Sequence, residues 1–200
     1  MAAAQTPLIP TKLALRRTIK AQREARTLAE RESASRSIAA VGLELPRLRR
    51  AECVTLYASL PDEPGTDQLR EGLRELQIRV LLPVIAGDRA LNWAEDAGGP
   101  GTAGPLGLTE PDGPRSGPAE LGKAQVVIVP ALAVDTIGTR LGRGRGYYDA
   151  ALTHAHPDAL ILALVHDGEV LDASTTPIPR EPHDVAVHGV ITPTRWIYFR

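Results

Sequence analysis

Short apolar runs that alternate with a helical pattern are the feature of this sequence that most constrains its fold. Residues 53–58 and 78–82 are rich in aliphatic residues, and a helical pattern over 67–77 lies between them. Further apolar runs follow at 125–129, 159–165 and 185–191. Continuous runs of this length are typical of strands that are covered on both faces. We therefore predict an α/β fold: an open, mainly parallel sheet with helices on both faces, in three Rossmann-like layers.

Length and composition favour one globular domain over residues 1–200. Hydrophobic residues make up 43% of the chain and charged residues 24%, which excludes disordered and collagen-like classes. Apolar runs are too short to span a bilayer, and Pro7, Pro10 and Lys12 interrupt the start of the chain before a signal peptide could form. We expect a cytoplasmic protein with no membrane partner.

The single cysteine, Cys53, excludes an intrachain disulfide and a metal site built from several thiolates. It lies in an apolar run, so we expect a buried small hydrophobe rather than a reactive thiol. The formal net charge of −1 argues against a protein that coats nucleic acid.

Residues 11–43 have the composition of one long helix or two helices. Seven basic and two acidic residues fall within 12–31. This excess fits a solvated helical face, or a stripe in which Lys12 and Arg16, one turn apart, point at an anionic ligand.

Residues 98–118 contain seven glycines and five prolines, too many for a regular element. We expect a long surface loop, in which 106–111 could dock on the domain.

The segment 138–149, GTRLGRGRGYYD, combines four glycines with three arginines. Glycine allows close approach of the backbone to a ligand, and arginine supplies charged, forked donors that suit phosphate. A helical pattern follows, with Tyr148, Leu152 and Ala155 on one face, so its first amides would add to an anion site. The segment therefore predicts a phosphate cradle, although it matches neither the Walker nor the dinucleotide-binding motif. A flexible surface turn and a nucleic-acid patch are the alternatives.

Three carboxylates, Asp149, Asp184 and Glu63, lie at or near the ends of predicted elements. Asp149 lies in the first turn of that helix, where it could simply cap the amides, and Asp184 ends the stiff segment PIPREPHD. If both lie at one edge of the sheet, they form an oxygen-ligand site of the kind that Mg²⁺ prefers, with His183 as a hydrogen-bonding spacer. Glu63 follows the first strand, where it could contact a bound ring or serve only as part of a connecting loop.

Taken in order, these segments resemble the 5-formyltetrahydrofolate cyclo-ligase family. The resemblance covers nearly the whole chain and includes KLALR from Lys12, DEPGT around Glu63, the GPLGLTEP stretch over 104–111, the string 129–149 and IPREPHD ending at Asp184. RLGRGRGYYD is its most specific part. The chain departs from the family's usual pattern at Leu106 and Val134, where aromatic residues are frequent.

The resemblance implies an ATP- and Mg²⁺-dependent enzyme that converts 5-formyltetrahydrofolate to 5,10-methenyltetrahydrofolate, with release of ADP and phosphate, through a phosphorylated formyl intermediate. We expect a monomer with no nucleic-acid partner. The implied catalytic residues are Arg140, Arg145 and Tyr147, and the implied metal ligands are Asp149 and Asp184. The implied ATP contacts are Lys12, Arg16, Arg140, Leu141, Gly142, Arg143, Gly144, Arg145, Gly146, Tyr147 and Tyr148. The implied folate contacts are Ala58, Glu63, Arg143, Gly144, Arg145, Gly146 and Tyr147.

A non-catalytic module that senses a phosphorylated metabolite is the main competing reading, because glycine, arginine and a helix terminus would serve it equally well. An RNA-associated role for the basic N-terminal helix is the other, and steep salt dependence would be its signature.

Overall fold

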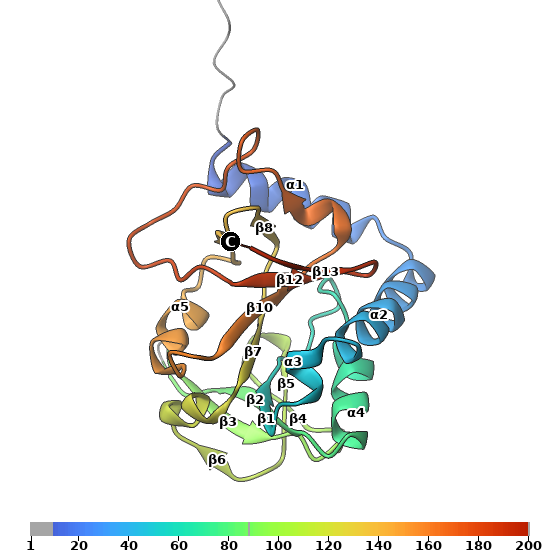
Figure 1. Cartoon of the computed structure of the whole chain (residues 1–200), viewed down its shortest axis with the longest axis vertical. Coiled ribbons are helices and arrows are strands. Elements are labelled where there is room, and N and C mark those ends of the chain that lie inside the picture. Colours follow the sequence, from blue (N-terminus) through green and yellow to red (C-terminus); the bar gives the residue numbers. More distant parts are fainter. Residues whose placement is uncertain (1–9, 88, 200) are drawn as a thin grey trace, which may run out of the picture.

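The computed structural model describes residues 10–87 and 89–199 and is built around one eight-stranded sheet (Figure 1). Its strand order is β13-β12-β10-β7-β1-β2-β3-β6. The central strands β12, β10, β7, β1 and β2 pair in parallel, whereas the outer strands β13, β3 and β6 pair antiparallel. The predicted open, mainly parallel sheet is thus confirmed. The strands span Cys53–Thr55 (β1), Arg79–Ile85 (β2), Leu91–Glu95 (β3), Arg115–Ser116 (β6), Val126–Pro130 (β7), Leu160–Leu164 (β10), Gly189–Ile191 (β12) and Trp196–Tyr198 (β13).

The strand order places a topological switch point at β1. The chain runs from β1 to β2 on one side, and later fills the other side with β7 and β10. Connections that leave β1 and β7 therefore diverge at the carboxyl edge of the sheet, which is where ligands bind in open α/β folds.

The side chains of the central strands alternate between two cores. Val54 and Ile128 face one core, with helices α2 (Leu28–Leu43), α3 (Pro46–Arg49) and α4 (Asp67–Glu75). Val127 and Val129 face the other, with α5 (Tyr147–Ala151) and two 3₁₀ segments. Figure 1 shows α2 and α4 on one side of the sheet and α5 on the other, so the predicted three layers are present.

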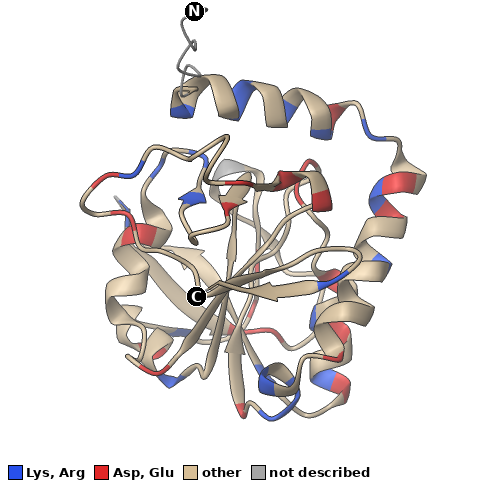
Figure 2. Ribbon diagram, turned by 45° about the horizontal axis from the view of Figure 1, so that its top comes forward, with Lys and Arg blue, Asp and Glu red and all other residues tan. Residues whose placement is uncertain are grey.

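The N-terminal helical segment is two helices. Thr11 caps α1 (Lys12–Glu24) through its side chain, and Thr27 starts α2 with a capping box that Glu30 completes. Unlike α2, α1 does not cover the main sheet. It packs through Ile19 on a small sheet formed by β8 (Ala133–Asp135), β9 (Arg140–Leu141) and β11 (Val170–Leu171). Figure 2 shows α1 lying across one end of the molecule, with basic positions along its length.

Two expectations about regular structure were wrong in part. The strand predicted over 185–191 is restricted to β12, because the amide of Val187 donates to the carbonyl of Gly138 rather than to a sheet neighbour. The segment 98–118 is not free of regular structure: β4 (Thr102–Ala103) pairs with β5 (Thr109–Glu110), and β6 extends the main sheet. The buried Glu110 carboxylate anchors this segment by accepting hydrogen bonds from the Ile85 amide and from Arg115.

Cys53 is buried in β1, as predicted, and burial raises the pKa of its thiol. Among the described residues, no helix is both long and apolar enough to cross a membrane.

Candidate active site

A cavity of about 410 Å³ opens at the carboxyl edge of the sheet, in the size range of small-molecule sites. Most of the sequence-predicted site residues line it: Ala58, Glu63, Arg140, Gly142, Arg143, Gly144, Arg145, Gly146, Tyr147, Tyr148 and Asp149. Lys12, Arg16, Leu141 and Asp184 do not line it. Segments that follow β1 and β7 thus meet where the switch point predicts a ligand site.

The connection after β1 holds Glu63 in a tight turn. The amide of Leu60 donates to Glu63 Oε2 at 3.0 Å, while the amide of Glu63 donates to the Leu60 carbonyl at 2.9 Å. Farther along, the Thr66 hydroxyl donates to the carbonyl of Tyr57 at 2.6 Å, which closes the loop at the start of α4. These bonds fix a carboxylate in the wall of the cavity.

The glycine-rich loop between β9 and α5 forms the opposite wall. Gly144 (φ +93°) and Gly146 (φ +76°) adopt left-handed conformations that other residues avoid. Helix α1 holds this loop, because Arg16 Nε donates to the Gly142 carbonyl at 2.9 Å. Arg16 therefore supports the loop from behind, and Leu141 packs in the core beneath it.

Helix α5 is shorter than the sequence predicts. It ends at Ala151 and continues only as a 3₁₀ turn over Leu152–His154, so its dipole is that of little more than one turn. The alternative in which Asp149 caps the helix is not seen, since Gly146 is the N-cap residue and no side chain in the described part of the chain bonds to the first amides.

Asp149 is instead held by Arg140, whose Nη2 donates to Asp149 Oδ1 at 2.6 Å. The Arg140 side chain is nearly buried, and its Nη1 also reaches the Pro130 carbonyl at 3.4 Å. A strand of the small sheet thereby fixes both the cation and the carboxylate in the cavity wall.

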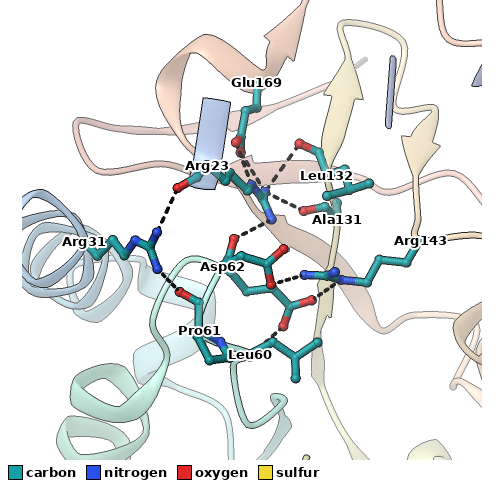
Figure 3. A network of polar contacts seen from close by, with 10 residues as sticks. Arg23, Arg31, Leu60, Pro61, Asp62, Ala131, Leu132, Arg143 and Glu169 are labelled. Carbon is teal, nitrogen blue, oxygen red and sulfur yellow. Dashed lines mark hydrogen bonds and ion pairs between the residues drawn. The ribbon is translucent and has the colours of Figure 1, made fainter. Parts of the chain in front are cut away.

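Arg143 bridges the two walls. Its Nε donates to Glu63 Oε1 at 2.8 Å, and its Nη2 donates to Asp62 Oδ1 at 2.6 Å. Figure 3 shows Arg143 reaching Asp62. Burial raises the pKa of Asp62, but the Arg143 guanidinium outweighs it and leaves that pKa below its ordinary value. Burial lowers the pKa of Arg143, and the two carboxylates reverse this so that its pKa is raised.

Behind this bridge lies a buried ion pair. Arg23 of α1 donates from Nε and Nη2 to the two oxygens of Glu169 at 2.7 Å, and from Nη2 to the Ala131 carbonyl at 2.8 Å. Figure 3 shows Arg23 and Arg143 reaching the loop of Asp62 from different sides. The position of the loop is thus determined by α1 as well as by the glycine-rich loop.

Lys12 and Asp184 form a separate pair outside the cavity wall. Lys12 Nζ donates to Asp184 Oδ2 at 2.7 Å, and the Glu181 amide donates to the same oxygen at 2.7 Å. Burial raises the pKa of Asp184, but these donors leave it lowered overall. Ligand atoms of Glu181, His183 and Asp184 lie within 4.8 Å of one another. The structure therefore does not bring Asp184 together with Asp149 in the cavity wall.

The charge of the cavity wall favours a polyanion. Lys20, Arg140, Arg143 and Arg145 line it, against the carboxylates of Glu63 and Asp149. Sequence reasoning missed Lys20, although its position one turn beyond Arg16 on α1 was a usable signal. It also missed Asp62, the second partner of Arg143.

An apolar wall from the β2–β3 hairpin and the Gly/Pro-rich segment completes the cavity. Pro83, Ile85, Leu91 and Leu108 form it. Nothing in their sequence context separates them from core residues. Such a wall suits the faces of a flat ring system.

The donor set suits a hard cation at Asp149. Mg²⁺ binds carboxylate oxygens and keeps several waters, which matches a partly exposed carboxylate in a cavity of this size. Asp184 offers a second carboxylate, but it lies with Lys12 and Glu181.

Comparison with known proteins identifies relatives along nearly the whole chain. The model of the 5-formyltetrahydrofolate cyclo-ligase family matches residues 9–193. A 5-formyltetrahydrofolate cyclo-ligase of Mycolicibacterium smegmatis is 46% identical over 149 residues, covering 72% of this chain and 75% of the relative. The enzyme of the same name from Escherichia coli K12 is 27% identical over 183 residues, covering 88% of this chain and 97% of the relative.

Two solved structures share the fold. The 5,10-methenyltetrahydrofolate synthetase of Aquifex aeolicus superposes with a TM-score of 0.80 at 24% identity, over 94% of this chain and 93% of that one. The 5,10-methenyltetrahydrofolate synthetase of Mycoplasma pneumoniae superposes with a TM-score of 0.71 at 20% identity. The superposition covers 91% of this chain and 98% of that one.

Proposed function

Because the chain belongs to the 5-formyltetrahydrofolate cyclo-ligase family, we propose that it converts 5-formyltetrahydrofolate to 5,10-methenyltetrahydrofolate and consumes ATP in the process. The observation that carries the proposal is the cavity at the switch point, in which a glycine- and arginine-rich wall faces a wall with one fixed carboxylate.

The chemistry explains the need for a phosphate donor. In a formamide the nitrogen lone pair is delocalised and the carbonyl oxygen is a poor leaving group, so direct ring closure is slow. If the formyl oxygen attacks the γ-phosphorus of ATP, ADP leaves and the oxygen becomes part of a phosphate ester. The neighbouring amine then attacks the formyl carbon and loses its proton, and inorganic phosphate departs to leave the methenyl bridge.

We assign ATP to the side of the cavity formed by the glycine-rich loop. The backbone of Gly142, Gly144 and Gly146 can approach phosphate oxygens closely, and Arg140, Arg145 and Lys20 supply positive charge. Each cation gains on the order of 4 kcal/mol at contact with a phosphate charge for an effective dielectric of 20, before desolvation. Arg16 acts in this proposal from the other face of the loop, where it positions the loop through the Gly142 carbonyl. Lys12 pairs with Asp184 instead.

Asp149 is the residue of this cavity that would hold Mg²⁺. Asp184 is the second candidate ligand, and to reach the same ion it would have to leave its pair with Lys12 outside the cavity wall. The ion supplies charge neutralisation for the phosphate oxygens. Arg140, which already bonds Asp149, would orient that carboxylate.

We assign the pterin ring of the folate to the wall that contains Glu63 and Ala58. The Glu63 carboxylate can accept hydrogen bonds from ring N–H groups, and Ile85, Leu91 and Leu108 can cover the ring faces. Arg143 and Tyr147 lie where the two substrates would meet. The protein then works by positioning and charge neutralisation, with no acyl-enzyme nucleophile.

We also propose that the protein acts as a monomer in the cytoplasm, with small-molecule substrates rather than nucleic acid or membranes as its partners. The aliphatic interior and the formal net charge of −1 support this.

The test is to mix the purified protein with 5-formyltetrahydrofolate, ATP and Mg²⁺, and to omit one component at a time. Formation of the methenyl product, followed by its near-ultraviolet absorbance, is expected only in the complete mixture. Folate and ATP binding without product would support a sensing module instead, and product formed without ATP would contradict the proposed chemistry.

A further inference from the structure

Two tyrosine hydroxyls in the cavity wall are buried without a partner. The oxygens of Tyr57 and Tyr148 are inaccessible to solvent and make no hydrogen bond among the described residues. Both residues line the cavity. Burial of a hydroxyl without a partner is costly, and most buried polar groups in folded proteins are paired. An unpartnered hydroxyl beside an open cavity therefore points to a partner that arrives with a ligand.

Tyr57 is the more informative of the two, because its backbone is fixed. It is the second residue after β1 and is only 3% exposed. The amide of Leu56 donates to the Leu81 carbonyl on β2, and the Tyr57 carbonyl accepts the Thr66 hydroxyl. The backbone that carries the ring is therefore held in place beside the cavity.

The charges around Tyr57 determine how its hydroxyl acts. Burial raises the pKa of Tyr57 well above its ordinary value, and the Glu63 carboxylate raises it further. The hydroxyl therefore stays protonated and is available as a donor. Glu63, in contrast, offers only acceptor oxygens.

We propose that the Tyr57 hydroxyl is a specificity-determining group that donates a hydrogen bond to an acceptor atom on the ring edge of the bound substrate. The inference rests on the proposed function, in which Glu63 accepts the N–H groups of the same heterocycle. A donor from Tyr57 beside an acceptor from Glu63 matches a ring edge on which N–H groups adjoin a carbonyl oxygen or a ring nitrogen. A 2-amino-4-oxopyrimidine presents such an edge, whereas a phosphate group does not.

Stability distinguishes this role from a structural one. A hydroxyl that holds the fold together stabilises the ligand-free protein, so its removal lowers the melting temperature. A hydroxyl that is paired only in the ligand complex is an unpaired buried group in the ligand-free protein, where it destabilises the fold. Tyr57→Phe should therefore raise the melting temperature of the ligand-free protein by about 2 °C.

The experiment compares the wild type with Tyr57→Phe and with Tyr198→Phe, a matched control on the edge strand β13 whose tyrosine is 42% exposed. Each protein is titrated by calorimetry with 5-formyltetrahydrofolate alone and with Mg-ATP alone, and is melted without ligand. Tyr57→Phe should bind the folate about tenfold more weakly and Mg-ATP with unchanged affinity. In turnover, its KM for the folate should rise with little change in kcat, because the ring edge is bound equally in ground and transition states. Tyr198→Phe should match the wild type throughout.

Unchanged folate affinity in Tyr57→Phe, or a lowered melting temperature with equal loss of both ligands, would overturn the inference while leaving the proposed function intact. Absence of folate binding by the wild type would overturn the proposed function itself.

Discussion

Arg143 and Glu63 lie 80 positions apart in the sequence, yet the guanidinium Nε of one donates to the carboxylate of the other at 2.8 Å. The bond joins the glycine-rich loop to the connection after β1, which are the two segments that the proposed function assigns to ATP and to folate. Figure 3 shows that the same guanidinium also reaches Asp62. A ligand that engages Glu63 therefore competes with Arg143, and a displaced Arg143 becomes available to phosphate.

The first prediction is that Arg143 couples the two substrates. In the wild type, bound folate should raise the affinity for a non-hydrolysable ATP analogue by about tenfold, a typical coupling between sites. In Arg143→Ala the two affinities should become independent. Calorimetric titration of the analogue with and without saturating folate measures this directly.

Arg143→Lys is the informative control for that prediction. It keeps one positive charge but lacks the planar fork that engages Asp62 and Glu63 together, so it should retain only part of the coupling. Full coupling in Arg143→Ala would show that the bridge has no role in communication between the substrates.

The second prediction concerns Asp149. Asp149→Asn keeps the shape of the side chain but removes the charge that holds the metal, so Mg²⁺-dependent turnover should fall by about 100-fold or more. The melting temperature should fall by only a few degrees, because asparagine loses the charge but keeps a side-chain oxygen that can accept from the buried Arg140. Steady-state assays over a Mg²⁺ titration provide the measurement.

Asp158→Asn is its matched control, since the Asp158 side chain is 92% exposed and lies outside the cavity wall. This variant should be as active as the wild type. Near-normal turnover in Asp149→Asn would remove Asp149 from the metal site.

The third prediction concerns the pair behind the Asp62 loop. The side chains of Arg23 and Glu169 are 1% and 5% exposed. Arg23→Met leaves a buried carboxylate unpaired and should cost about 3–5 kcal/mol of unfolding free energy, whereas adding Glu169→Met should recover part of that loss. Urea denaturation of the single and double variants tests this.

Arg17→Met, at an exposed position of α1, should cost less than about 0.5 kcal/mol. If Arg23→Met lowered the unfolding free energy as little as this control does, the Arg23–Glu169 pair would not determine the position of α1.

The fourth prediction is a pH dependence of stability. Burial lowers the pKa of His166 to about 4, from 6.5 in the unfolded chain. The unfolded chain therefore takes up a proton at a higher pH than the folded protein does. The contribution of His166 to stability is complete above pH 6.5, declines as pH falls from 6.5 to 4, and totals roughly 3 kcal/mol at most.

Replacement of His166 by asparagine should reduce the slope of unfolding free energy against pH within that window and leave the slope above pH 7 unchanged. Denaturation curves between pH 4 and 8 are the measurement. An identical slope in both proteins would mean that His166 is protonated equally in the folded and unfolded states.

Local patterns were enough to predict the central sheet, because buried parallel strands such as β7 and β10 are continuous apolar runs. They were not enough for β6, which forms in a segment that Gly and Pro dominate. There the tertiary contacts of Glu110 override the local preference of the chain. The short β12 reflects the same effect, since Val187 bonds to a loop that no sequence window of ordinary length contains.

The glycine-rich loop was visible in the sequence because its composition has few structural explanations. The position of Asp184 was not, because its pairing with Lys12 joins residues 172 positions apart. Tyr57 was missed for a different reason. Its place at the end of an apolar run resembles that of a core residue, and only the structure shows that its hydroxyl has no partner within residues 10–87 and 89–199.

The central claim is that one cavity brings the γ-phosphate of ATP to the formyl oxygen of the folate. The most direct test uses 5-formyltetrahydrofolate labelled with ¹⁸O in the formyl group, with the released phosphate analysed by mass spectrometry. One ¹⁸O atom is expected in each phosphate formed. Phosphate that carries only solvent oxygen would contradict it, because ATP would then have been cleaved by water rather than by the substrate.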